Sequence, residues 1–295
     1  MNVRSYLRLM RIPNVFTAFA NVVAGVYLAR GGMFHARDLL VVLSSGCLYC
    51  AGMVLNDFFD RDVDARERPE RPIPSGEISA TAAAAVGCGL AALGLALAAL
   101  HGGLPIMFAG LLLCAILAYD ALLKDSWLGP VAMGACRGLN VAMGLSVQPA
   151  LHSWLTPLWL VLALFTLLIT QLSRFEVLGT QPERVRVTLK GFIALALAAF
   201  AALVMLAFQR EAAPLAWLAA ALAFSFVLYR ERQLLSPIWQ QATGPTLGRA
   251  IGGGILLMPA IDASFVAAAG APLAAAATLS FMLPAWWLKR WYYLT

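Results

Sequence analysis

Charged residues are scarce in this chain. Only 12% of its 295 residues are Asp, Glu, Lys or Arg, whereas 61% are hydrophobic. A soluble domain averages about 25% charged residues, so a water-soluble protein of this size could not bury so much apolar surface. The apolar runs are about 18–23 residues long, enough for a helix to cross the hydrocarbon core, and are rich in Ala, Leu and Gly. They predict an all-α, polytopic transmembrane helix bundle rather than an alternating barrel.

Cysteine and histidine are also few, which argues against a structural metal site. Cys47 and Cys50 form a CxxC, but no second pair or nearby histidine completes a zinc site. The net charge is +6, and we interpret it as the usual basic bias of membrane-protein loops, with no nucleic-acid partner. We expect the lipid bilayer to surround the helix bundle.

Turn residues divide the chain into ten expected helices within a single domain, 1–295. The helices cover residues 13–30, 38–60, 78–100, 103–123, 127–148, 154–173, 188–208, 212–229, 247–269 and 272–289. Two four-helix pseudo-repeats, 13–124 and 127–230, each offer one long charged loop, and helices at 247–289 follow them. Pseudo-repeats often place membrane sites at their interface.

The basic residues set an orientation. With the N-terminus inside, inner segments hold 17 of the 21 Lys and Arg, and outer segments hold Arg30, Arg37 and Arg210. Arg137 lies within a helix. Because cytoplasmic loops carry the excess of Lys and Arg, we expect both termini in the cytoplasm and a multi-pass protein of a bacterial inner membrane.

One acidic stretch begins inside an apolar helix and continues into a loop. Seven of the fifteen acidic residues lie between positions 57 and 77. Asn56, Asp60 and Asp64 follow a four-residue step, so on a helix they share one stripe, with Asp57 at its edge and Asp62 facing away. Clustered carboxylates repel each other and need a cation. Their oxygen ligands suit Mg²⁺, which binds through one or two carboxylates and substrate phosphates.

Basic residues follow directly. Arg66, Arg68 and Arg71 lie in a proline-rich loop that ends at Gly76, where they can hold phosphate oxygens. A positive-inside loop anchor is the alternative explanation for each arginine. Farther along, Arg137 and Asn140 share a face of an apolar helix. A buried charge should face the bundle interior or a polar cavity.

The acidic stretch NDxxDxxxD (56–64) followed by RPxPSG (71–76) resembles the first aspartate-rich motif of the UbiA superfamily of membrane prenyltransferases. The segment RxxRxxN (8–14) is similar to the opening segment of that family, and Tyr119 with Lys124 resembles its Tyr/Lys pair. This resemblance implies a UbiA-like bundle that moves a prenyl group from an allylic prenyl diphosphate to a lipophilic acceptor, with Mg²⁺, at the cytoplasmic face.

The second motif of that family, DxxxD, is missing. The corresponding segment contains Arg174 and Glu176, and the next carboxylate is Glu183. Arg174 could replace part of a missing metal charge, the reaction could differ, or activity could be lost. The Arg-Gly-Leu-Asn of 137–140, together with this segment, resembles the EboC-type branch of the superfamily.

The resemblance and the residue pattern together imply a set of site residues. The expected metal ligands are Asn56, Asp60 and Asp64. The expected catalytic residues are Asp60, Asp64, Lys124, Glu176 and Arg174, with Glu176 on the wall opposite Asp60. The expected substrate-binding residues are Asn14, Arg66, Arg71, Tyr119, Arg137 and Asn140.

Two rival functions remain at this point. One is a non-catalytic UbiA-like carrier or assembly protein, which the degraded second motif favours. The other is a phospholipid head-group transferase, whose signature needs an Asp-Gly pair that this chain lacks.

We predict that a reporter fused to the C-terminus is active on the cytoplasmic side. The reason is that Lys289 and Arg290 follow the last apolar run. If only nine helices crossed the membrane, these two basic residues would lie outside, against the usual distribution of Lys and Arg. Paired fluorescent-protein and alkaline-phosphatase fusions measure this directly. A C-terminal fusion active only in the periplasm would contradict the ten-helix topology.

Overall fold

The chain folds into a bundle of helices. The computed structural model describes residues 3–148, 156–178 and 182–291, and this part of the chain contains no strand. The longer helices are α2 (Ile12–Ala29), α3 (Leu39–Phe59), α5 (Ala80–His101), α6 (Pro105–Ala118), α7 (Gly129–Leu145), α9 (Leu158–Leu178), α10 (Pro182–Gln209), α11 (Pro214–Gln240) and α12 (Gly244–Ala268). The short ones are α1 (Val3–Leu9), η1 (Ala36–Asp38), α4 (Arg61–Glu67), η2 (Tyr119–Leu123), α13 (Pro272–Ser280) and α14 (Met282–Leu288).

Each of the ten expected segments overlaps a helix, but the ends differ: α10 begins at Pro182 rather than at 188, and α11 ends at Gln240 rather than at 229. Residues 154 and 155 of the sixth segment lie outside the described residues. Seven helices in the described part are long and apolar enough to cross a membrane. Of the other three, α7 has 17 residues, α11 carries charged residues at 230–232, and the tenth is divided into α13 and α14 at Phe281. The all-helical, multi-pass membrane class is confirmed, whereas the number of crossings and the pseudo-repeats stay predictions.

Three helices form the centre of the bundle. Helix α2 packs on α7 and α12, with α3 and α5 on one side and α9 and α11 on the other. Burial follows this arrangement, because 89% of the apolar window of α12 and 78% of that of α2 are buried, against 17% for α6 and 28% for α10. The outer helices therefore face the surroundings with apolar side chains, as a bilayer requires.

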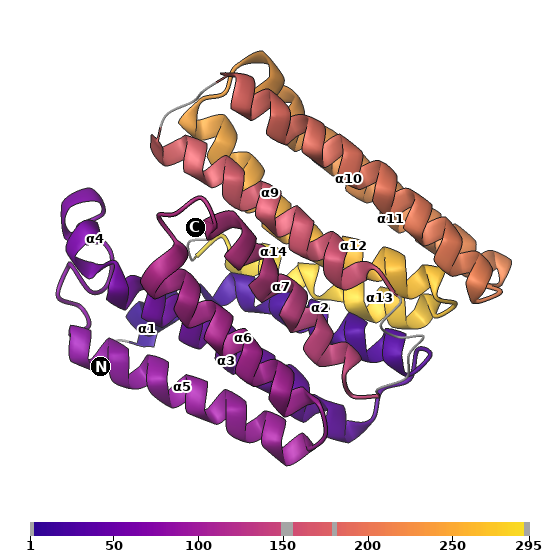
Figure 1. Ribbon diagram of the computed structural model, residues 1–295, viewed down its shortest axis with the longest axis horizontal. Coiled ribbons are helices and arrows are strands. Elements are labelled where there is room, and N and C mark those ends of the chain that lie inside the picture. Colours follow the sequence, from indigo (N-terminus) through magenta and orange to yellow (C-terminus); the bar gives the residue numbers. More distant parts are fainter. Residues whose placement is uncertain (1–2, 149–155, 179–181, 292–295) are drawn as a thin grey trace.

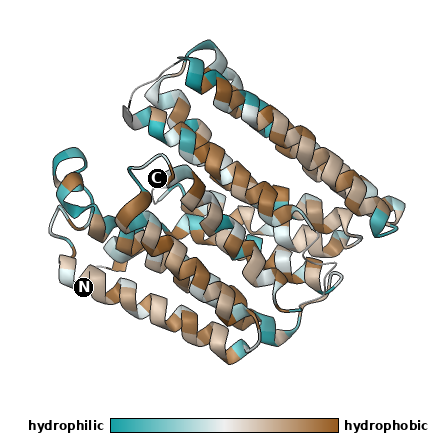
Figure 2. Cartoon of the chain, viewed as in Figure 1, coloured by the Kyte–Doolittle hydropathy of each residue, from teal (hydrophilic) through white to brown (hydrophobic). Residues whose placement is uncertain are grey.

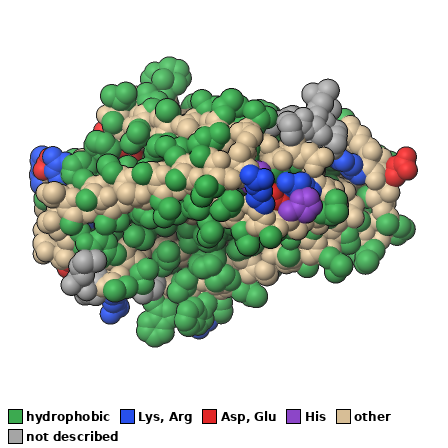
Figure 3. Space-filling model, turned by 90° about the horizontal axis from the view of Figure 1, so that it is seen from below, with side chains coloured by type: hydrophobic (Ala, Val, Ile, Leu, Met, Phe, Trp, Pro, Cys, Tyr) green, Lys and Arg blue, Asp and Glu red, His purple; other side chains and the backbone are tan. Residues whose placement is uncertain are grey.

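The surface agrees with this assignment. Polar residues gather at helix ends and in the connections, and the lengths of the helices are largely apolar (Figure 2). Hydrophobic side chains also cover most of one face, and charged groups on it are few (Figure 3). The N-terminus, α4 and the connection from α6 to α7 lie toward one end of the bundle (Figure 1).

Two glycines allow α2 and α7 to touch. A Cβ on Gly144 would lie 2.3 Å from the carbonyl oxygen of Val22, and one on Gly25 would lie 2.6 Å from that of Val141. Backbone meets backbone at this contact, so no side chain can move aside. In membranes, where the hydrophobic effect does not drive helices together, small residues permit this close packing.

We predict that Gly144→Ala lowers the stability of the bundle, because overpacking costs about 1–3 kcal/mol. The matched control is Gly110→Ala on α6, where an added Cβ meets nothing within 4 Å. Thermal unfolding of both variants in one detergent measures the difference. Equal melting temperatures would contradict a tight α2–α7 contact.

Candidate functional site

The acidic stretch keeps its four-residue step across a helix break. Helix α3 ends at Phe59 and α4 begins at Arg61. The Asp60 N–H donates to the carbonyl oxygen of Asn56 at 2.9 Å, and the Asp64 N–H donates to that of Asp60 at 2.8 Å. These helical hydrogen bonds carry the stripe past the break, so Asn56, Asp60 and Asp64 stay on related faces.

One half of the site is a four-residue ionic cluster. Arg11, at the start of α2, donates from Nη2 to Oδ1 of Asp57 at 3.0 Å. Arg71 bridges two carboxylates, with Nη1 at 2.6 Å from Oδ2 of Asp64 and 3.4 Å from Oδ1 of Asp57. Both acidic side chains are nearly buried, at 7% and 6% exposed. Charges this buried are stable only when paired.

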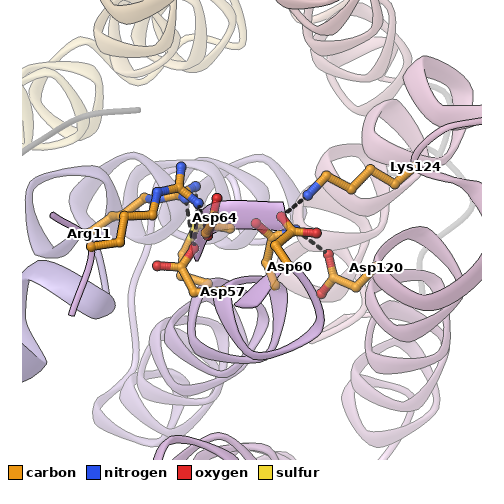
Figure 4. A network of polar contacts seen from close by, with 9 residues as sticks. Arg11, Asp57, Asp60, Asp64, Asp120 and Lys124 are labelled. Atoms are coloured by element: carbon orange, nitrogen blue, oxygen red, sulfur yellow. Dashed lines mark hydrogen bonds and ion pairs between the residues drawn. The ribbon is translucent and has the colours of Figure 1, made fainter. Parts of the chain in front are cut away.

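The other half joins α3 to the segment after α6 (Figure 4). The Nδ2 of Asn56 donates to Oδ1 of Asp120 at 2.9 Å. Lys124 forms an ion pair with Asp60. The segment η2, which carries Asp120, is a π-helical turn, a form often found at functional sites.

Asp62 lies away from both halves. Its side chain is 78% exposed and contacts only the neighbouring Arg61, at 3.8 Å, among ion pairs of the described residues. The exposed fraction of Asp60 is 19%. The helical rotation between the two positions therefore separates a site carboxylate from a surface one.

The donor set fits a hard divalent cation held jointly with phosphate. The described residues contain no group of three His, Cys, Asp or Glu side chains close enough to bind a metal on their own. However, Mg²⁺ needs only one or two carboxylates with substrate phosphates and waters, and Asp60 and Asp120 supply carboxylates beside the Asn56 amide. The buried Oδ2 of Asp120 has no hydrogen-bond partner among the described residues, so an acceptor oxygen remains available there.

A cavity opens beside this site. Asp120 and Tyr119 lie at the end of the cavity next to the carboxylates, and its walls include the apolar side chains of Met53, Leu112 and Ile116. It lies among α2, α3, α6 and α7. An apolar group attached to a polar head could occupy it, with the head toward the carboxylates.

The structure brings only some of the expected residues together. Arg66 is exposed and donates to the backbone of Asp62 at 3.4 Å, away from the carboxylates. Arg174 donates from Nη1 to the carbonyl oxygen of Ser126 at 2.7 Å and from Nη2 to that of Asp125 at 3.4 Å. It therefore fixes the turn that follows Lys124.

Glu176 lies against a different helix. Its Oε1 would be 3.0 Å from a Cβ on Gly248 of α12, and the side chain is exposed. No hydrogen bond or ion pair joins it to the carboxylate cluster among the residues that the structure describes. Its place on an opposite wall stays a prediction.

The remaining expected residues lie deeper. Asn14 is buried and hydrogen-bonds Tyr49, a cavity residue. Asn140 lines the cavity but is held on both sides, because its Nδ2 donates to the carbonyl oxygen of Ala18 at 3.0 Å and its Oδ1 accepts from Ser45 at 2.7 Å. Arg137 also lines the cavity.

The sequence did not assign Arg11, Asp57 or Asp120 to the site. Arg11 was visible within the RxxRxxN segment and Asp57 at the edge of the stripe, while Asp120 was a polar residue in an apolar run four residues before Lys124. The signal that could have found Asp120 is its position in the sequence, directly after Tyr119 and four residues before Lys124, which places all three residues in one short segment.

A latch holds the N-terminal segment near the site. Ser5 Oγ donates to Oε2 of Glu77 at 2.5 Å, and Arg8 Nη1 lies 3.1 Å from Oε1. The Ser5 hydrogen bond and the Arg8 charge hold the pKa of the Glu77 carboxyl below its usual range. Arg8 Nη2 also donates to the carbonyl oxygen of Glu70 at 3.1 Å, so α1 is tied to the loop that presents Arg71.

Comparison with known families decides the assignment. Residues 18–175, just over half of the chain, match the UbiA prenyltransferase family. The chain belongs to the UbiA prenyltransferase family. The matched region contains the Asn56–Asp64 stretch and ends at Phe175, and the assignment to an EboC-type branch of the superfamily stays a prediction.

Similar UbiA proteins come from archaea. The chain is 32% identical over 182 residues to digeranylgeranylglyceryl phosphate synthase of Metallosphaera sedula, covering 61% of this chain and 63% of that protein. It is 39% identical over 88 residues to the Methanopyrus kandleri protein of the same name, covering 29% and 32%. The chain thus spans less than two thirds of the length of these relatives.

Solved UbiA structures share the fold. A UbiA homologue from Archaeoglobus fulgidus, bound to GPP and Mg²⁺, has a TM-score of 0.59 at 17% identity, covering 94% of this chain and 99% of that one. The apo structure of a homologue from Aeropyrum pernix has a TM-score of 0.65 at 19% identity, covering 84% and 96%. Similarity at this identity shows the fold alone.

Proposed function

We propose that this UbiA member is an intramembrane prenyltransferase. It would move a prenyl group from an allylic diphosphate to a lipophilic acceptor, with Mg²⁺, at the cytoplasmic face. The observation that supports this most is the pairing of Arg11, Arg71 and Lys124 with Asp57, Asp60 and Asp64 next to a largely apolar cavity that Asp120 lines. A charged diphosphate head and an apolar prenyl tail match these two surroundings.

The charges favour binding of metal and diphosphate together. Four carboxylates (Asp57, Asp60, Asp64 and Asp120) lie beside three basic side chains, so the site has no positive excess when all are ionised. A diphosphate adds negative charge, which a divalent cation would offset. Asp60, Asp64 and Asn56 are the proposed ligands, and Asp120 lies close enough to Asn56 to contribute.

The proposed chemistry is ionisation of the allylic C–O bond. The bonding electron pair leaves with the diphosphate, the allyl cation forms a bond to the nucleophile of the acceptor, and the acceptor loses a proton to solvent. Bound Mg²⁺ would neutralise charge that grows on the leaving oxygen. Arg71 and Lys124 would turn from their carboxylate partners toward phosphate oxygens, where cations stabilise the charge that develops in the transition state.

Arg174 contributes indirectly in this proposal. It holds the carbonyl oxygens of Asp125 and Ser126, the residues directly after Lys124. Loss of the guanidinium would free this turn and with it the position of the lysine. We therefore expect Arg174 to act as a positioning residue rather than to touch the diphosphate.

The orientation is also a proposal. The site lies at the end of the bundle that holds α4 and the N-terminus (Figure 1), and the excess of Lys and Arg assigns that end to the cytoplasm. A prenyl diphosphate, which is charged and water-soluble at its head, would then enter from the cytoplasm, while the acceptor would enter from lipid.

We predict that Asp60→Asn and Asp64→Asn each lower prenyl transfer by at least about 100-fold, on the scale of losing one electrostatic group from a catalytic site. Asp62→Asn is the matched control, and should cost less than about fivefold because its carboxylate is exposed. The assay follows labelled prenyl diphosphates with a membrane lipid extract, across a Mg²⁺ titration and with EDTA. Purified protein in detergent is used throughout.

Two results would contradict this proposal. Equal losses in all three variants would show that the stripe does not select the functional carboxylates. Binding of prenyl diphosphate without turnover of any acceptor in the extract would favour the non-catalytic carrier.

A further inference from the structure

One carboxylate joins the N-terminal helix to the loop that precedes α5. Glu77 accepts a hydrogen bond from Ser5 Oγ at 2.5 Å, and Arg8 Nη1 lies 3.1 and 3.4 Å from its two oxygens. Ser5 and Arg8 are three residues apart on α1, so they share one face of that helix. Only 1% of Ser5 is exposed, although α1 is a short helix at one end of the bundle (Figure 1). These three residues, the latch, therefore fix residues 3–11, which we call the strap.

A small apolar cluster supports the latch. Leu9 of the strap is 0% exposed and Ile78, the residue after Glu77, is 3% exposed. Both belong to one buried cluster with Val54 of α3 and Ala83 of α5. Strap and loop are thus packed together as well as hydrogen-bonded, so a shift of the strap would also shift the loop.

The loop carries this contact to Arg71. The Ile78 N–H donates to the carbonyl oxygen of Pro72 at 2.9 Å. On the other side, Arg8 Nη2 donates to the carbonyl oxygen of Glu70 at 3.1 Å. The backbone is therefore tied to the latch both before and after Arg71.

The strap ends at Arg11, whose backbone is strained. Arg11 has a φ of 47° and a ψ of 51°, in the left-handed region that residues with a Cβ rarely adopt. Such a conformation persists only where the surrounding structure imposes it. The latch holds the chain before Arg11, and the ion pair with Asp57 holds its guanidinium. The latch thus contributes to the position of this arginine too.

Two like charges converge where these connections end. Arg11 Nη2 and Arg71 Nη1 lie 3.0 and 3.4 Å from the same oxygen, Oδ1 of Asp57. Guanidinium groups this close repel each other, so their joint position depends on what holds the segments that carry them. The latch holds both segments. It therefore keeps two cations together at the site proposed for the diphosphate.

We infer that Glu77 is a positioning residue for the proposed prenyl transfer, and this inference rests on that function. Through its two partners on the strap, Glu77 keeps Arg11 and Arg71 together. It thereby raises the affinity of the site for the diphosphate group of the allylic substrate. Its effect is opposite in sign to that of an isolated carboxylate near an anion site, which would weaken diphosphate binding by repulsion.

A latch that only stabilised the fold would behave differently. The side chains of Glu77 and Arg8 are 36% and 19% exposed, and ion pairs this exposed add little to folding stability. The Ser5 hydrogen bond and the Arg8 charge lower the pKa of the Glu77 carboxyl, so it is ionised at neutral pH and its replacement by Gln removes a full negative charge. The direction in which diphosphate affinity then changes separates positioning from simple electrostatics.

The test measures binding of geranyl thiolodiphosphate with Mg²⁺, by calorimetry on the purified full chain in nonionic detergent at neutral pH. Glu77→Gln should raise the Kd by about 5–20-fold, less than the roughly 100-fold that a 1 Å misplacement of a group can cost. Ser5→Ala, which changes no charge, should raise it as well. In the transfer assay kcat/KM should fall by at least the same factor, because the arginines also act on the leaving diphosphate.

Glu67→Gln is the matched control. It removes an exposed carboxylate from α4, at the same end of the bundle but outside the latch. Loss of this charge should leave the Kd unchanged or lower it slightly. A rise in the Kd equal to that of Glu77→Gln would contradict a role specific to the latch.

An exchanged ion pair tests the connection itself. Arg8→Glu and Glu77→Arg should each weaken binding, the second in spite of its added positive charge, because each places two like charges together. The double variant restores opposite charges, and the Ser5 hydroxyl can accept from an arginine as well as donate to a carboxylate. The double variant should therefore bind more tightly than either single variant, and a double-mutant cycle measures this coupling.

The inference is overturned if Glu77→Gln and Ser5→Ala bind the analogue as tightly as the wild type, or if Glu77→Gln binds it more tightly. Gel filtration and melting show whether each variant is folded, and if Glu77→Gln is not, Ser5→Ala and the exchanged pair decide. A wild type that transfers prenyl groups while the latch variants keep its affinity contradicts only this inference. A wild type whose analogue binding depends on the latch but which transfers no prenyl group contradicts only the proposed reaction.

Discussion

Buried charges in a membrane bundle must be paired, and the rest of the site depends on this constraint. Asp57, at the end of the apolar helix α3, and Asp64, on the short helix α4 that follows it, are almost inaccessible, and an unpaired carboxylate there would be costly. Arg11 pairs with Asp57, which is 46 residues away in the sequence. Arg71 pairs most closely with Asp64, which is 7 residues away. The ionic cluster therefore ties the start of α2 and the loop after α4 to the end of α3.

The same ion pairs would let the basic side chains exchange partners when a metal and a diphosphate bind. A basic side chain that neutralises a carboxylate can instead donate to a phosphate when a metal takes over that carboxylate. Lys124 directly follows the π-helical turn η2, and Arg71 lies on a loop held by the Ser5–Glu77 latch, so both are attached to segments outside the long helices. These short segments hold the two basic side chains near the carboxylates. Because neither side chain belongs to a long packed helix, a change of partner would not disturb the packing of the bundle.

Part of this account follows from the sequence alone. Apolar length and the Ala- and Leu-rich composition predict the helical membrane class, and the four-residue step predicts which face carries Asn56 and Asp60. Periodicity does not identify partners across the bundle, however. The pairing of Asp57 with Arg11 depends on where α2 begins relative to α3, and the inward place of Asp120 depends on a π-helical turn that no spacing rule predicts. The four-residue step and the two four-helix pseudo-repeats predict Glu176 on the wall opposite Asp60, and this stays a prediction; what the structure shows is that the Glu176 side chain lies near Gly248 of α12.

The central claim is that the carboxylates and basic side chains form one site for a metal and a diphosphate together. The most direct measurement is Mn²⁺ binding, followed by electron paramagnetic resonance, to the purified protein with and without geranyl thiolodiphosphate. The account predicts weak Mn²⁺ binding alone, at least tenfold tighter binding with the diphosphate analogue, and loss of this gain in Asp60→Asn. Mn²⁺ affinity that is unaffected by the analogue, or that is unchanged in Asp60→Asn, would contradict it.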